Sequence, residues 1–136
     1  MRLTIPWACL ASDNLRKRYT PGKGDKAWGR YKSARDTAST VVQAQYHGPM
    51  YCEAVSMEIL FYLPNDRRRD PTNLLKMVQD SLSGIIYDDD KRITSLSWLN
   101  MGVDRDNPRA EVTVMPGTLH ATWAEPCRTD TAETKP

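Results

Sequence analysis

Acidic, basic and amide side chains gather in one stretch of the chain, residues 66–93, at spacings that could bring them to one surface. Asp70 lies where a predicted strand hands over to a predicted helix, and Asp90 lies just before the next predicted strand. Asn73 and Lys76 follow Asp70 at helical spacing, on the face opposite a stripe of leucines. Because side chains at element ends can converge above a sheet, we expect these groups to meet.

Carboxylates clustered without histidine or cysteine are hard oxygen ligands, which favour Mg²⁺ or Mn²⁺ over zinc. Here the cluster would comprise Asp70 and the run Asp88-Asp89-Asp90. A cation between such acids relieves their repulsion and can activate water against a phosphodiester. Lys76 could then neutralise the charge that develops on the phosphate. Two plainer interpretations stay open: Asp70 as a helix N-cap, and the acidic run as a solvated turn.

Positive charge is concentrated locally, although the net charge is only +2. One cluster precedes Asp70 directly, and the other lies in a predicted N-terminal loop. Clusters of this kind would hold phosphates of a nucleic-acid backbone, and they are equally typical of a solvated face. The residues concerned are Arg67, Arg68 and Arg69, and then Arg16, Lys17, Arg18, Lys23 and Lys26. Asn73 is a further candidate for contact with DNA.

The length of 136 residues favours one domain, which we expect over residues 1–115, followed by a Thr-, Pro- and Glu-rich tail over 116–136 that we expect to be loose. There is no apolar run of about 18 residues, so no membrane span is predicted. Three widely spaced cysteines form neither a zinc pattern nor a complete disulfide framework. These features together predict a cytoplasmic protein.

The elements that must position these residues follow from periodicity and turn signals. Asp70 and Pro71 start a helix that Gly84 is expected to end. The last two strands, joined by a turn-rich segment, are predicted to form a hairpin. The order is β-α-β-α-β-β, an α+β domain with a small mixed sheet against two helices. We expect strands over residues 2–7, 53–64, 92–101 and 109–115, and helices over residues 27–46 and 70–84.

The stretch "RRRDPTNLLKMVQDSLSGIIYDDDKRI" resembles the signature of the RusA-type Holliday junction resolvases. That signature combines a basic run, an acid, an asparagine, a lysine, Asp-x-Leu and a final acid pair. The matching residues here are Asp70, Asn73, Lys76, Asp80-Ser81-Leu82 and Asp89-Asp90. A weaker likeness, which includes "LTIPWACLASDN" and "RYKSARDTAS", extends the resemblance to about 110 residues.

The resemblance implies a phage-type, homodimeric, Mg²⁺-dependent endonuclease with a RusA-like fold, acting in DNA recombination or repair in a bacterial host. It would cut four-way DNA junctions by paired symmetric nicks, with Mn²⁺ as a possible substitute. By this likeness Asp70 and Asp90 are metal ligands and Lys76 is a catalytic cation. The chain departs from the pattern at Thr72, where the family usually has an acid, and Asp88 or Asp89 is the nearest candidate replacement.

Two alternatives stay open. The protein could bind junctions with weak or no cleavage, or it could be a nuclease that prefers flaps or forks.

Overall fold

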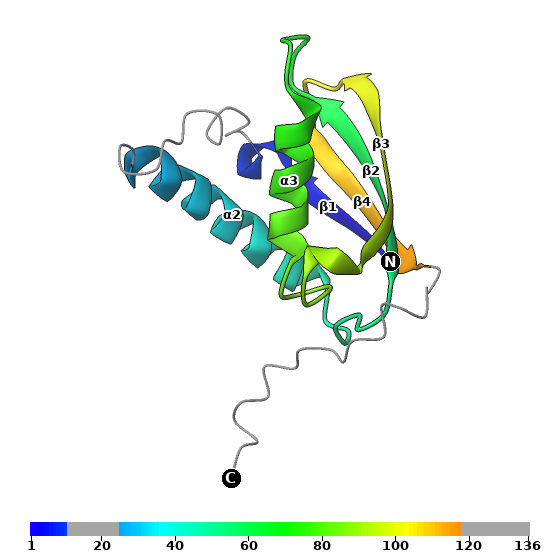
Figure 1. Ribbon diagram of the computed structural model, residues 1–136. Coiled ribbons are helices and arrows are strands. Elements are labelled where there is room, and N and C mark those ends of the chain that lie inside the picture. The colour runs from blue at the N-terminus through cyan, green and yellow to red at the C-terminus, as the bar shows by residue number, and fades with distance from the viewer. Residues whose placement is uncertain (11–24, 118–136) are drawn as a thin grey trace.

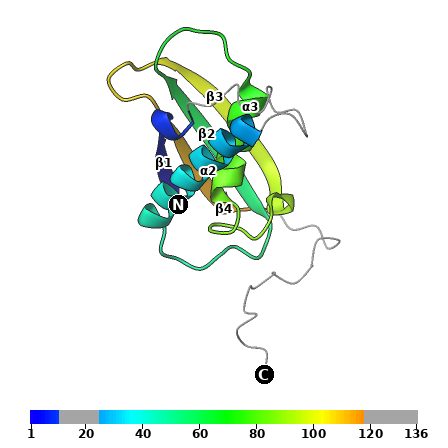
Figure 2. The same ribbon diagram turned by 90° about the vertical axis from the view of Figure 1, so that its left-hand side faces the viewer.

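The computed structural model describes residues 1–10 and 25–117, which form one four-stranded sheet with two α-helices on the same face (Figures 1 and 2). The predicted α+β class and the order β-α-β-α-β-β are confirmed. The elements are β1 (Arg2–Pro6), η1 (Trp7–Cys9), α2 (Asp25–Gln45), β2 (Val55–Leu63), α3 (Pro71–Leu82), η2 (Asp90–Arg92), β3 (Ile93–Val103) and β4 (Arg109–Pro116).

The strand order across the sheet is β1-β4-β2-β3, so β3 and β4 do not pair with one another. The predicted hairpin is therefore wrong. β3 runs parallel to β2 after the α3 crossover, and β4 returns antiparallel on the other side of β2. The connection passes the end of β2, where the Asp104 amide donates to the Leu63 carbonyl at 2.8 Å. β2 and β4 are the inner strands of the sheet, and each buries alternate residues in the core.

The core lies between the sheet and the two helices. β2 directs Val55, Met57, Ile59 and Phe61 into it, each at most 1% exposed, as its period-2 pattern predicted. α3 meets this surface with an apolar stripe, and burying one such side chain contributes about 1.5–3 kcal/mol. The buried apolar residues of α3 are Leu74, Met77, Val78 and Leu82.

α3 begins where the sequence predicted. Asp70 is the N-cap, its Oδ1 accepts from the Thr72 amide at 2.9 Å, and Pro71 is the first helical residue. The helix ends at Leu82, with the C-cap one residue before Gly84. Gly84 has φ +85°, a left-handed conformation that glycine adopts without steric cost.

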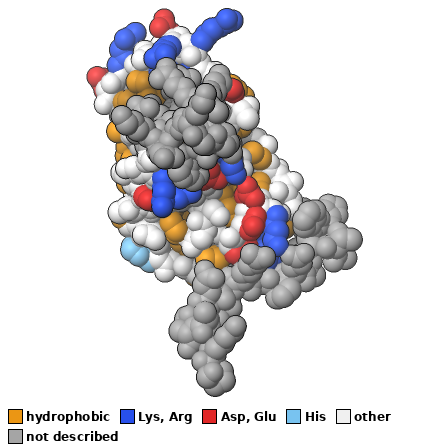
Figure 3. All heavy atoms as spheres, turned by 60° about the vertical axis from the view of Figure 1, so that its left-hand side comes forward, with side chains coloured by type: hydrophobic (Ala, Val, Ile, Leu, Met, Phe, Trp, Pro, Cys, Tyr) orange, Lys and Arg blue, Asp and Glu red, His pale blue; other side chains and the backbone are white. Residues whose placement is uncertain are grey.

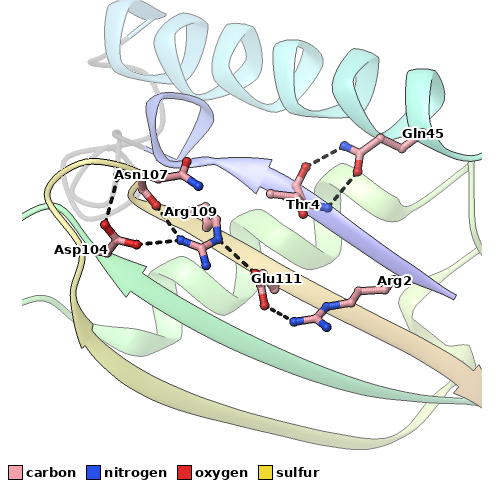
Figure 4. A network of polar contacts seen from close by, with 7 residues as sticks. All are labelled: Arg2, Thr4, Gln45, Asp104, Asn107, Arg109 and Glu111. Atoms are coloured by element: carbon pink, nitrogen blue, oxygen red, sulfur yellow. Dashed lines mark hydrogen bonds and ion pairs between the residues drawn. The ribbon is translucent and has the colours of Figure 1, made fainter.

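The two outer strands of the sheet differ in how their edges are treated. The side-chain amide of Gln45 from α2 covers the β1 edge by pairing with both backbone groups of Thr4, at 2.9 and 2.6 Å (Figure 4). β3 lies at the opposite edge, and within the described ranges no strand pairs with its outer side (Figure 1). The β3 side chains are exposed over most of their length.

No helix in the described part of the chain is both long and apolar enough to cross a membrane. The predicted tail lies almost entirely outside the described residues, so the division at residue 115 stays a prediction.

Candidate active site

Lys76, in the second turn of α3, is the centre of a charged cluster. Its Nζ lies 2.9 Å from Oδ1 of Asp80, one turn further along α3, and 3.2 Å from Oδ2 of Asp90. Asp90 opens η2, directly before β3, so the predicted convergence of helix and strand end occurs for Lys76 and Asp90. Figure 3 shows acidic and basic side chains side by side on the face that bears the helices.

The acids around Lys76 determine its charge state. Partial burial alone would lower the pKa of the ammonium, but the hydrogen bonds and charges of Asp80 and Asp90 outweigh burial and raise that pKa above its ordinary value. Lys76 is therefore protonated at neutral pH. It can stabilise negative charge, but it cannot serve as a general base.

Tyr31, on α2, extends this cluster across the two helices. Its hydroxyl donates to Oδ2 of Asp80, while Oδ1 of the same carboxylate binds Lys76. Tyr31, Asp80, Lys76 and Asp90 thus form one continuous chain of hydrogen bonds. Nothing in the sequence marks Tyr31 as a site residue, because its helical spacing indicates only an inward-facing position. Its side chain is 4% exposed. Part of this chain lines a pocket of about 440 Å³ between α2 and α3.

The three acids of the run 88–90 have three different environments. Asp88 forms a buried ion pair with Arg92, at 2.8 Å to Nε and 3.1 Å to Nη2. Asp89 caps η2, accepting from the Lys91 amide at 3.0 Å. That bond, followed by a hydrogen bond with the Asp90 side chain, lowers the pKa of Asp89. Asp88 is thus committed to Arg92, while Asp89 and Asp90 form a close carboxyl pair on the surface.

Asp70 and Asn73 flank the N-terminal end of α3. One oxygen of Asp70 serves as the N-cap acceptor, so the capping interpretation is correct. The side-chain nitrogen of Asn73 is buried and has no hydrogen-bond partner within the described structure. Buried donors are normally paired. An oxygen of a bound phosphate or water would satisfy this donor.

The donors present fit a hard divalent cation that is completed by other ligands. Within the described residues, no three His, Cys, Asp or Glu side chains lie close enough to hold a metal ion by themselves. Mg²⁺ usually keeps several waters and binds one or two carboxylates together with substrate phosphates. The close pair of Asp89 and Asp90 suits that mode, because two neighbouring carboxyls repel unless a proton or a cation lies between them.

The three arginines before α3 have different environments. Arg69 is fixed: its Nη1 donates to the Arg67 carbonyl at 2.9 Å, its Nη2 donates to Asn65 Oδ1 at 2.6 Å, and its guanidinium lies over the Trp7 ring at 5.0 Å. Arg67 and Arg68 are exposed. Arg69 therefore braces the loop, and the two exposed arginines are the ones placed to meet a polyanion.

The other predicted basic cluster lies mostly outside the described residues. Arg16, Lys17, Arg18 and Lys23 lie outside the described residues, and of Lys26 only the position in α2 is described. Their role stays a prediction.

A protein-family model with the description "Endodeoxyribonuclease RusA" matches residues 11–115, which is more than half of the chain and includes every described residue of the charged cluster. No sequence among the curated proteins matches the chain.

Proposed function

Because the chain belongs to the family of RusA endodeoxyribonucleases, we propose that it resolves four-way DNA junctions by paired symmetric nicks, with Mg²⁺ as its cofactor. The family assignment makes the protein a hydrolase and places it among metal-dependent Holliday junction endonucleases. The identity of the cation, the residues that act and the symmetry of the cut are part of the proposal, as is a homodimer. A two-fold axis would present one site to each of two opposed strands.

The observation that carries the proposal is the position of Lys76 between Asp80 and Asp90. In the proposed reaction the Lys76 ammonium lies beside the attacked phosphate and offsets the negative charge of the transition state. Asp80 fixes the direction of the ammonium, and Tyr31 fixes Asp80. Preorganised charge of this kind is effective because it does not have to reorient during the reaction.

Asp70 and Asp90, with Asp89 beside Asp90, would hold the divalent cation, which when bound would lower the pKa of a water and offset charge on the phosphate. The cap at Thr72 fixes one oxygen of Asp70 and so orients the carboxylate at the start of α3. Arg67 and Arg68 would bind neighbouring phosphates. Because the protein offers no group of three close ligands among its described residues, we expect cation affinity to be low without DNA and to rise when the junction binds.

Asp70→Asn tests the proposed site. Asparagine is as good an N-cap as aspartate, so the variant should fold with unchanged stability. The loss of one carboxylate charge should abolish cleavage of a synthetic four-way junction in Mg²⁺, while the dissociation constant for the junction changes little. Asp106→Asn, an exposed loop position away from the cluster, is the matched control and should cut normally. If Asp70→Asn cuts as fast as wild type, the proposed metal site is wrong.

A second candidate function is junction binding with weak or no cleavage. It is favoured by Thr72, whose exposed side chain supplies no charge at the start of α3. Thr72→Asp tests it: a carboxylate in the first turn of a helix is favourable, so the fold should tolerate the change. We expect this variant to cut faster than wild type at limiting Mg²⁺. Paired nicks made by wild type, with either Mg²⁺ or Mn²⁺, would exclude the binding-only function, and faster cutting of flaps or forks would change the substrate assignment.

A further inference from the structure

A groove of about 380 Å³ lies between β3 and the loop that leads into α3. Its floor is apolar, with Phe61 and Leu74 at most 3% exposed and Trp98 39% exposed. Its rim is charged, because Arg67 and Arg68 line it together with Asp66. The groove thus combines an aromatic surface with two cations, a mixture that resembles neither a protein core nor a purely polar phosphate site.

Trp98 is held in place while part of its ring remains accessible. Its ring packs edge-on against Phe61, with 6.3 Å between centroids and an angle of 62° between the planes. Trp98 is the register partner of Ile59, which places it on the sheet face that carries the helices. The next residue, Leu99, is the partner of Leu60 and points to the opposite face. The exposed part of the Trp98 ring is therefore a fixed, flat apolar surface beside the arginines.

The groove adjoins Asp70, one residue of the proposed active site. Asp70 lies in the chain between Arg69 and Pro71, and both of these residues line the groove. In Figure 1 the loop before α3 lies at the end of the sheet where β3 finishes. A DNA strand with a phosphate at Asp70 would consequently carry its neighbouring nucleotide over the groove.

We propose that this groove receives one unpaired base of the substrate DNA, next to the phosphate that is cut. The base would stack on Trp98, its phosphate would bind Arg67 or Arg68, and the Asp66 carboxylate would accept from an exocyclic amino group. This inference rests on the proposed function and adds a source of selectivity to it. Nucleotides at a branch point can leave the stack at lower cost than those inside a duplex.

Affinity for junctions that lack a single base tests the proposal. Each nucleotide around the branch point is replaced in turn by an abasic residue, and binding is measured in EDTA so that no strand is cut. For wild type we expect one position at which loss of the base weakens binding by about 5- to 150-fold. In Trp98→Ala, removal of that base should weaken binding little further. In Trp98→Phe, removal of the base should weaken binding as it does in wild type. Leu99→Ala, 57% exposed on the opposite sheet face, is the matched control and should also retain it.

The competing outcomes are separable. If no abasic position couples to Trp98 although junctions are bound and cut, the groove proposal fails and the proposed function stands. If Trp98→Ala changes the oligomeric state and weakens all substrates equally, the groove is an interface between copies of the chain and the proposal is overturned. If the wild type has no more affinity for junctions than for duplex DNA, both proposals fail.

Discussion

The buried ion pair between Asp88 and Arg92 predicts a large loss of folding stability when one of its two charges is removed. Two hydrogen bonds of 2.8 and 3.1 Å join the side chains, which are only 3% and 5% exposed. In Arg92→Met the carboxylate would remain buried without its cation, and removing one partner of such a pair costs about 3–5 kcal/mol. For a domain of this size the melting temperature should fall by on the order of 10 °C.

The assay is urea denaturation and thermal melting of four proteins: wild type, Arg92→Met, Asp88→Leu and the double variant. Replacing both charges by apolar groups should recover most of the loss, because neither side chain then needs a partner. Arg35→Met is the matched control, since Arg35 and Asp36 form a more accessible pair at 3.6 Å, with 31% and 62% of the side chains exposed, that should contribute less than about 1 kcal/mol. A loss below about 1 kcal/mol in Arg92→Met, or a double variant less stable than either single one, would refute this account of the pair.

Two further predictions concern the hydroxyl on α2 and the ion-pair network on the open face of the sheet. Tyr31→Phe should slow single-turnover cleavage by on the order of 10-fold and leave junction affinity unchanged. The reason is that a hydrogen bond to a charged group contributes about 1.5–3 kcal/mol. Equal losses in rate and affinity would contradict a positioning role for Tyr31. The hydrogen bond from Arg109 is the main cause of the lowered pKa of Asp104 (Figure 4). This pair should therefore stabilise the fold fully above the ordinary carboxyl pKa of 3.8, and its contribution should be lost as the pH falls through the lowered pKa of Asp104. The stability difference between wild type and Arg109→Met, measured by denaturation, should therefore shrink below about pH 4, and a constant difference from pH 7 to pH 3 would show that the pair is not its origin.

Local signals predicted the features that depend on neighbouring residues. The start of α3 at Asp70 and Pro71 follows from the chemistry of helix ends, and the buried face of β2 follows from strict alternation. The meeting of Lys76 and Asp90 was also predictable, because helix spacing and the position before a strand limit where each side chain can lie.

Features that depend on distant parts of the chain could not be predicted in the same way. A turn-rich segment before β4 indicates that the chain reverses, but it does not reveal that β2 lies between the two strands. The three consecutive arginines are the same residue type, so the sequence does not distinguish them. Arg69 differs from the other two through its contacts with Trp7 and Asn65 in the folded chain. Tyr31 likewise contacts Asp80 only because α2 packs against α3.

The unequal edges of the sheet limit how copies of this chain can associate through strand pairing. The Gln45 amide occupies the hydrogen-bonding groups of Thr4 that a further strand beside β1 would need. β3 has no charged residue from Ile93 to Val103, so it can align antiparallel with a second β3 without like-charge repulsion. Such a pairing would occupy, among the strands that the structure describes, the open edge of each molecule. Growth would then stop at two subunits, because an extended fibre needs two open edges on every subunit.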